Sequence, residues 1–188
     1  MRLPLSWFAL ALVGGLLASG AQAGTVTLDF EDLTCARSQA QCEVGDQYTA
    51  RGFALRYSPA EDEPLAAGLV GVGTAWKANR KGSLALSIRS CDTQVSLMAN
   101  DNQPFSLLSI DLAEMTGEGP TAVTFRGLKE DGSEVRQTFK LGPKPGWQRY
   151  TFDAGFRGLN SVQWAQGDCL NQRPHMVDNL VLASSVKP

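Results

Sequence analysis

The residues best suited to bind a ligand lie in a short polar segment around Trp76. Its indole is followed by Asn79 and Arg80, so an aromatic face and hydrogen-bonding groups occur together. Sugars are bound by this combination, because a ring stacks on the sugar and polar groups bond its hydroxyls. The sequence therefore predicts a ligand site of Trp76, Asn79 and Arg80, with Tyr57 and Tyr48 as weaker stacking candidates. The alternative for Trp76 is ordinary packing beneath a loop.

No residue pattern indicates catalysis. The acidic run 61–63 offers carboxylates of the kind that glycosidases use in pairs, but an acidic run in a loop is usually solvated. No G-x-S-x-G sequence occurs, and residues 90–92 form no nucleophile motif. The glycine-rich stretch 68–73 is not followed by the helix that a phosphate-binding loop requires. With a single histidine, His175, the chain is also a poor basis for a Ser-His-Asp triad. We expect a protein that is not an enzyme.

Four cysteines could form two disulfides, and they are Cys35, Cys42, Cys91 and Cys169. Four cysteines allow three pairings, and the sequence does not prove one of them. Cys35 and Cys42 share a short polar segment, so a local loop is the simplest pairing, which leaves Cys91 with Cys169. The alternative is a zinc site, but its usual C-x₂-C spacing is absent.

Residues 1–23 are expected to be a signal peptide. Arg2 is followed by a mostly apolar, uncharged run over residues 3–17 and then by the A-x-A cleavage pattern of residues 21–23. The run is short for a membrane span, which needs roughly 20 residues; a retained anchor is the alternative. No cysteine directly follows the cleavage pattern, so a lipid anchor is not expected. We expect a secreted or periplasmic protein whose mature chain is not inserted in a membrane.

Cleavage would leave 188 − 23 = 165 residues, which is enough for one domain over residues 24–188. Without Arg2 the charge balance is 16 Lys and Arg against 19 Asp and Glu, a net charge of −3. No basic stripe is visible in the sequence, so nucleic acid is not an expected partner. The oligomeric state is left open.

Side chains that alternate between apolar and polar predict half-buried β-strands along most of the chain. The predicted strands cover residues 25–31, 53–57, 84–89, 108–112, 122–128, 134–141, 150–152, 162–164 and 177–182. Asp131-Gly132 separates two of these runs and predicts a hairpin turn, and residues 58–73 are expected to form the longest loop. Trp164 alternates with Val162 and is expected in the core, whereas Trp147 is expected to pack where a strand begins. The fold class predicted is all-β, with two antiparallel sheets in a sandwich.

The order of several short phrases resembles a known group of domains. They are LDFEDL at 28–33, FSLLSIDL at 105–112, VTFRG at 123–127, the turn at 131–132, YTF at 150–152 and VDNLVL at 177–182. This order resembles jelly-roll domains similar to carbohydrate-binding modules of exported bacterial proteins, including proteins with PEP-CTERM sorting tails. The opening DFE and closing DN-aliphatic phrases also resemble the MAM-type jelly roll. The resemblance implies a galactose-binding-like jelly roll and carbohydrate as ligand. Two features depart from it: the chain lacks a sorting tail, and the segment 35–42 matches no family pattern.

The resemblance also implies a structural calcium ion between the first and last strands. The matching acids are Glu31 and Asp178, with Asp29 and Asn179 as secondary ligands; calcium prefers such oxygen ligands. If Leu180 faces the core, strict alternation would turn Asp178 inward as well, so a bulge or a sheet-edge position is needed to bring the acids together. The alternative is that these acids bond backbone groups of turns.

Three functions follow from these observations. The first is a non-catalytic binding module outside the cytoplasm, with carbohydrate as the ligand that the resemblance implies. The second is a structural or interaction protein of the envelope or matrix without a small ligand. The third is a hydrolase whose acids the sequence does not reveal. An exposed Trp76 beside a concave sheet face or a loop pocket would favour the first function, and a flat surface with a large apolar patch would favour the second. A cleft that holds two acids at the separation found in glycosidases would favour the third.

Overall fold

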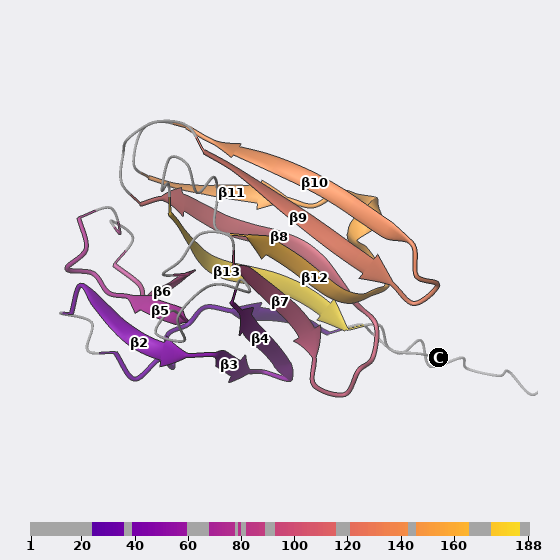
Figure 1. Ribbon diagram of the computed structural model, residues 1–188, viewed down its shortest axis with the longest axis horizontal. Coiled ribbons are helices and arrows are strands. Elements are labelled where there is room, and N and C mark those ends of the chain that lie inside the picture. The colour runs from indigo at the N-terminus through magenta and orange to yellow at the C-terminus, as the bar shows by residue number, and fades with distance from the viewer. Residues whose placement is uncertain are drawn as a thin grey trace, which may run out of the picture.

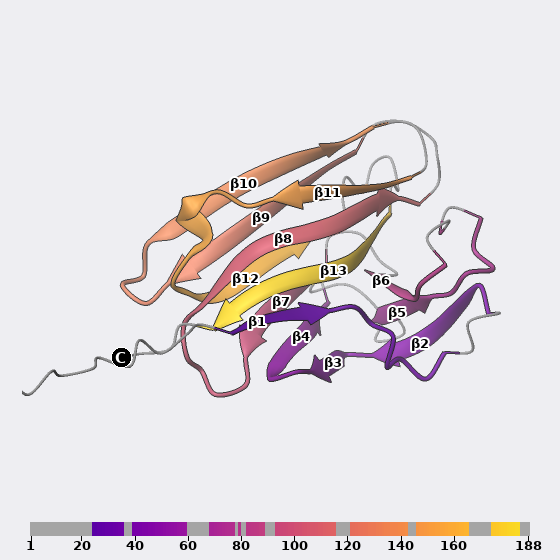
Figure 2. The same cartoon turned by 180° about the vertical axis from the view of Figure 1, so that it is seen from behind.

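Antiparallel strands form two layers that enclose the core, as the opposite views of Figures 1 and 2 show. A computed structural model describes residues 24–35, 39–59, 68–77, 79, 82–88, 93–115, 121–142, 146–165 and 174–184. In this part of the chain the only helix is the 3₁₀ turn η1 (Ala154–Phe156), and no helix is long and apolar enough to cross a membrane.

We call the first layer sheet I. Its strands are β1 (Thr25–Leu28), β2 (Gln41–Gly45), β5 (Leu69–Val72), β6 (Ala85–Ile88), β8 (Phe105–Glu114), β11 (Trp147–Thr151) and β13 (His175–Ser184). Their order is β2-β5-β6-β13-β8-β11. β1 pairs with the C-terminal half of β13, so the first strand lies beside the last. Sheet I is nearer the viewer in Figure 2.

The second layer, sheet II, is nearer the viewer in Figure 1. Its strands are β3 (Gln47–Ala50), β4 (Phe53–Ser58), β7 (Gln94–Ala99), β9 (Thr121–Lys129), β10 (Glu134–Leu141) and β12 (Leu159–Ala165). Their order is β3-β4-β7-β12-β9-β10. One bridge from Leu159 to Phe105 joins the two layers at a corner. Every pairing between the described strands is antiparallel and the strands form two packed sheets, so the prediction of an all-β antiparallel sandwich is confirmed.

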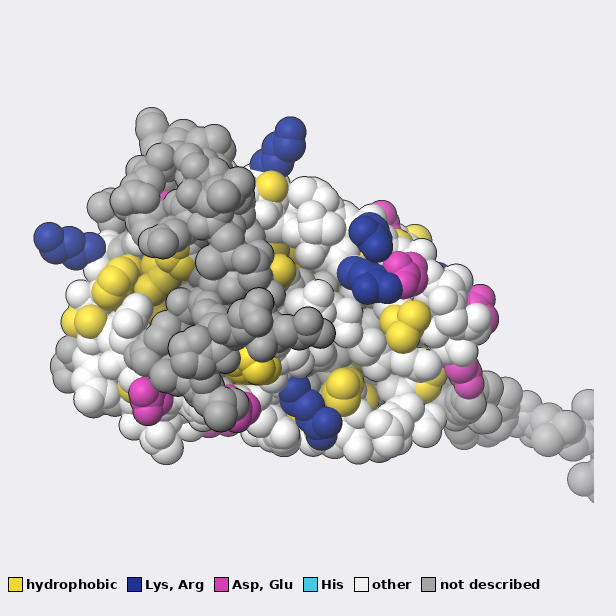
Figure 3. Space-filling model, in the orientation of Figure 1, with side chains coloured by type: hydrophobic (Ala, Val, Ile, Leu, Met, Phe, Trp, Pro, Cys, Tyr) yellow, Lys and Arg dark blue, Asp and Glu magenta, His cyan; other side chains and the backbone are white. Residues whose placement is uncertain are grey.

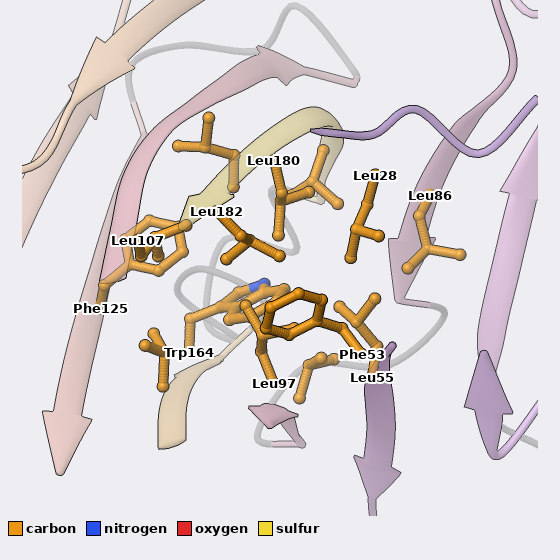
Figure 4. Packing of buried hydrophobic residues seen from close by; sticks show 14 of the residues in the cluster. Leu28, Phe53, Leu55, Leu86, Leu97, Leu107, Phe125, Trp164, Leu180 and Leu182 are labelled. Carbon is orange, nitrogen blue, oxygen red and sulfur yellow. The ribbon is translucent and has the colours of Figure 1, made fainter. Parts of the chain in front are cut away.

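The core lies between the inner faces of the two sheets (Figure 4). Leu28, Leu180 and Leu182 reach it from β1 and β13, and Trp164 meets them from sheet II, as its alternation predicts. At one end of the core, the ring of Phe125 contacts other aromatic rings. Its centroid is 5.1 Å from that of Phe152 and 5.4 Å from that of Trp164. Such edge-to-face and tilted ring pairs add stabilisation beyond the burial of their area.

One strand lies where a loop was expected. The prediction that residues 58–73 form a single loop is wrong for its last part, because β5 occupies Leu69–Val72. All four residues of β5 are buried, so both faces of the strand are covered and it shows no alternation. The strands β2, β3 and β7 were also not predicted.

The local disulfide between Cys35 and Cys42 is confirmed, with 5.7 Å between the two Cα atoms. It packs directly on the backbone of β5 at Gly71, where a side chain would meet both sulfur atoms. Cys91 and Cys169 lie outside the described residues, so their pairing stays a prediction.

Two buried polar residues face each other across β8 and β13 at one end of the sandwich. His175 is paired in register with Glu114, and both are nearly inaccessible to solvent. Neither ring nitrogen of His175 has a hydrogen-bond partner within the described segments. Burial lowers the pKa of His175 from its ordinary 6.5 to about 4, so the imidazole is neutral at neutral pH.

The close packing of Gly71 makes the first testable prediction. We expect Gly71→Ala to destabilise the fold by about 1–3 kcal/mol, because the new Cβ would lie 2.8 Å from Cys42 Sγ and closer still to Cys35 Sγ. Urea unfolding measures the effect. Gly142→Ala is the matched control, because nothing lies within 4 Å of a Cβ at that position. Equal stability of the two variants would contradict this packing.

The second prediction concerns acid stability. The unfolded chain binds a proton on His175 near pH 6.5, whereas the folded chain binds it only near pH 4, so stability is lost as the pH falls between these values. The full loss is about 3 kcal/mol for this one group. Because the chain has a single histidine, His175→Leu isolates the effect. Urea unfolding across this pH range should show a smaller loss for the variant than for the wild type; parallel curves would rule out the buried, neutral imidazole.

Candidate ligand-binding face

The outer face of sheet I carries a second apolar cluster, separate from the main core. Its buried members are Val72, Ala85, Ala113, Met115 and Met176. They alternate along their strands with residues that point into the main core, as Ala113 does with Leu112. Two half-buried tryptophans, Trp76 and Trp147, pack against this cluster. The outer face of this sheet therefore presents two indoles on an apolar base.

Trp76 lies in a tight loop between β5 and β6, and Asn79 holds that loop in shape. The amide of Trp76 donates to Gly73 O at 3.2 Å, and that of Asn79 donates to Trp76 O at 2.9 Å. The Asn79 side chain is 3% exposed, and its Nδ2 donates to the carbonyl oxygens of Val72, Gly73 and Ser83 at 3.1, 3.3 and 2.9 Å. One amide group thus ties both ends of the loop to the sheet.

Hydrogen bonds fix the orientation of both indoles. Trp76 Nε1 donates to Met115 O at 3.4 Å, and Trp147 Nε1 donates to Asn79 Oδ1 at 3.3 Å. Because both indole N–H groups are used within the protein, the parts left for a ligand are the apolar rings. Asn79 thereby links the loop of Trp76 to the strand of Trp147.

Beside the indoles lies a polar group around Asp111. Arg149 donates from Nε to Asp111 Oδ1 at 2.8 Å and from Nη2 to Oδ2 at 3.3 Å, and Asn179 Nδ2 donates to Oδ2 at 2.9 Å. The Arg149 side chain is 61% exposed, whereas that of Asp111 is 6% exposed. The hydrogen bonds and charge of Asp111 raise the pKa of Arg149 further above its usual value. Arg149 follows Trp147 by two residues on β11, so both side chains lie on the same face.

The two main acids of the implied calcium site, Asp178 and Glu31, accept hydrogen bonds from two consecutive residues. Ser83 Oγ donates to Asp178 Oδ2 at 3.0 Å, and the amide of Leu84 donates to Glu31 Oε1 at 2.9 Å. A register shift between Asp178 and Val181, with Asn179 at φ 47°, supplies the bulge that this arrangement needs. Val177 and Leu180 can therefore both reach the core while Asp178 points to the outer face.

Glu31 and Asp178 accept hydrogen bonds from neighbouring protein groups, which is the kind of role that the alternative without a metal describes. Asp178 Oδ1 also accepts the amide of Asn179 at 2.7 Å, so both carboxylate oxygens have donors. Asp29 lies apart and pairs with Arg51 at 3.2 Å. Over the described ranges, no group of three or more His, Cys, Asp or Glu side chains could hold a metal ion. Calcium at Glu31, Asp178, Asp29 and Asn179 stays a prediction.

The predicted sugar-binding residues have different locations. Trp76 lies on the face just described, and Asn79 is buried beneath it. Arg80 lies outside the described residues. Tyr57 is 8% exposed and belongs to the main core, and Tyr48 is buried there with its hydroxyl donating to Asp32 at 2.5 Å. Neither tyrosine has a ring face open to a ligand.

Sequence reasoning did not include Trp147, Asp111 or Arg149 among the candidate site residues. Trp147 begins β11, as expected, but it packs on the outer face of the sheet. The spacing of Trp147 and Arg149, two residues apart in a strand, is a local signal that could have indicated a shared face. The pairing of Asp111 with Arg149 comes from the register of β8 and β11 and has no local signal.

Two pockets formed by described residues lie elsewhere, and the aromatic side chains that line them are almost fully buried. One, of about 420 Å³, is at the end of the sandwich and is lined by Arg51, Gln103, Phe53 and Phe105 among others. Both of these phenylalanines are almost fully buried. The other, of about 220 Å³, lies beside the disulfide and is lined by Asp32, Glu43 and Tyr48 among others.

Comparison with known proteins finds similarity of fold. No protein-family model matches the chain, and no curated protein does. Similar solved structures include a family 29 carbohydrate-binding module from Piromyces equi, with 12% identity over 87% of this chain and 91% of that chain and a TM-score of 0.47. A xylan-binding domain of family 22 has 11% identity over 86% and 96% of the two chains and a TM-score of 0.49. An exo-β-agarase has 12% identity and a TM-score of 0.50, covering 85% of this chain and 24% of that chain.

Proposed function

We propose that this protein is a non-catalytic carbohydrate-binding module that binds its ligand on the outer face of sheet I, across Trp76 and Trp147. The observation that carries the proposal is the pair of half-buried indoles, each fixed by a hydrogen bond from its own N–H group. Rigid aromatic side chains bind with a small loss of conformational entropy, because they are already ordered before the ligand arrives.

Arg149 supplies the polar part of this site. A guanidinium has five N–H donors, and Asp111 takes one from Nε and one from Nη2. The remaining donors belong to an exposed side chain on the face that holds Trp147. Sugar hydroxyls accept such hydrogen bonds, while the apolar face of the sugar ring can lie on an indole. This pairing of surfaces supports a carbohydrate ligand.

The acids of this face support binding rather than hydrolysis. Asp111 and Asp178 are partners in register, but both are buried and accept hydrogen bonds from neighbouring side chains. A glycosidase needs two carboxyl groups that flank the sugar and exchange protons with it. Carboxylates held under the surface in this way position other residues.

The proposed location is outside the cytoplasm, in the periplasm or beyond the cell. The disulfide between Cys35 and Cys42 supports it, because such bonds persist mainly in oxidising compartments. The expected signal peptide, residues 1–23, lies outside the described residues. For the second candidate, a structural protein without a small ligand, a large apolar patch would be expected; among the described residues Leu128, 40% exposed, is the one exposed large hydrophobic side chain.

The third prediction tests the indoles. We expect Trp76→Ala and Trp147→Ala each to weaken binding of the ligand identified by a glycan array by about tenfold, the value of one lost stacking contact. Isothermal titration measures the affinity, and near-ultraviolet circular dichroism verifies folding. Leu128→Ala is the matched control, because it removes an exposed apolar side chain from the other sheet. Unchanged affinity in both tryptophan variants would refute this site.

The fourth prediction separates binding from stability. Arg149→Lys should weaken glycan binding about five- to tenfold through lost hydrogen bonds, while the melting temperature should fall only modestly, because the ammonium still neutralises the buried carboxylate of Asp111. The same titration and a thermal melt give both values. Arg157→Met, at another exposed position, should change neither. A large fall in melting temperature without loss of affinity would assign Arg149 to the fold.

A further inference from the structure

We propose that the outer face of sheet II binds an acidic polysaccharide, along a row of side chains that crosses the sheet from Arg136 to Arg56. This surface lies on the opposite side of the sandwich from Trp76 and Trp147 and does not depend on them.

The row follows from the register of five strands. Arg136 on β10 is paired with Arg126 on β9, and Arg126 is paired with Gln163 on β12. Gln163 is paired with Ser96 on β7, and Ser96 with Arg56 on β4. Each of these side chains alternates with buried residues of the core, so all five point to the outer face.

The row is long enough for a chain ligand. Neighbouring strands lie about 4.8 Å apart, so four steps separate Arg136 from Arg56 by roughly 19 Å. The two end positions are therefore too far apart for a single small anion. A linear polymer that crosses the strands could contact both ends and bond to Gln163 and Ser96 between them.

The charge on this face is positive although the whole chain has a net charge of −2. Among the described residues, the outward positions of its strands hold four cations, Arg56, Arg126, Arg136 and Lys140, against one acid, Glu134. Figure 3 shows this side of the molecule, with basic side chains next to an acidic one over β9 and β10, and with further acidic side chains toward the margins of the view. The excess of positive charge is local, so it attracts an anionic ligand to this face.

Two of the arginines lie directly opposite each other, which is unfavourable for like charges. Glu134 compensates in part: Arg126 Nη2 donates to its Oε1, and Arg136 Nη2 lies 3.5 Å from its Oε2. The bonds from Arg126 lower the pKa of Glu134, so the acid stays ionised. One acid between two cations leaves a net charge of +1, and the two arginine side chains remain 45% and 65% exposed. Arg56 forms no ion pair within the described segments and adds a second charge.

The chemistry of the face selects the class of anion. A guanidinium bonds a carboxylate through two parallel N–H groups, which suits the uronic acids of acidic polysaccharides. No outward side chain of β3, β4, β7, β9, β10 or β12 is aromatic, so the face lacks the stacking surfaces of single-strand nucleic-acid sites. It also lacks the apolar side chains that insert into a lipid bilayer, apart from Leu128 and Met98.

The test uses polygalacturonate as the probe and its fully methyl-esterified form as the uncharged control. Affinity gel electrophoresis and isothermal titration of the full chain should show binding to the acid that weakens between about 50 and about 200 mM salt, and little binding to the ester. Equal binding to both polymers, or no binding to the acid, would overturn the proposal. Tighter binding to a single-stranded polynucleotide or to anionic lipid vesicles would also overturn it.

Variants locate the binding on the row. The combined variant Arg56→Gln, Arg126→Gln, Arg136→Gln should lose at least about tenfold in affinity for polygalacturonate. Arg56→Gln alone, at a position that forms no ion pair with the described residues, should lose about two- to fivefold in affinity with an unchanged melting temperature, so the test survives if the combined variant does not fold. Arg157→Gln is the matched control and should bind like the wild type. Wild-type affinity in the Arg56 and combined variants would refute the row, and unchanged binding in Trp76→Ala would separate this face from the proposed sugar site.

Discussion

The last strand, β13, places side chains on both faces of sheet I, and the way it does so determines the arrangement of the rest of the sheet. β13 pairs with β8 along one edge and with β6 and β1 along the other. Val177 and Leu180 both belong to the core, which strict alternation does not allow for residues three apart. The bulge at Asp178 and Asn179 resolves this conflict. It also turns Asp178 toward Asp111 on the outer face, where two buried carboxylates require donors.

Those donors come from segments far apart in the sequence. Ser83 bonds Asp178, Leu84 bonds Glu31, and Arg149 bonds Asp111. The acids Asp178, Glu31 and Asp111 therefore bind the loop that carries Trp76, the turn after β1 and the edge strand β11 to sheet I. The indole pair and the exposed guanidinium lie where this polar group meets the second apolar cluster. The proposed binding surface therefore lies beside the groups that complete the hydrogen bonds of β13.

The sequence was most informative where one face of a strand is buried and the other is solvated. β9 and β10 alternate throughout and could be predicted with their turn, and β7 has the same alternation and could have been found. β5 could not, because burial on both faces removes the period of two. The approach of Glu31 and Asp178 followed from a resemblance, but the bulge had no signal in the residues. The pairing of Arg149 with Asp111 and the row of arginines depend on register between distant strands, so no local pattern indicates them.

The connection between β2 and β3 joins the edge of one sheet directly to the edge of the other. β2 and β3 are the end strands of their sheets, yet Asp46 alone separates them in the chain, and its carbonyl accepts the amide of Tyr57 at 2.8 Å. Among the described strands, the two outermost edges on this side are short and follow one another through a single residue, next to a segment closed by the disulfide. Short edges offer little template for a foreign strand. This margin therefore resists the edge-to-edge association by which sheet proteins aggregate.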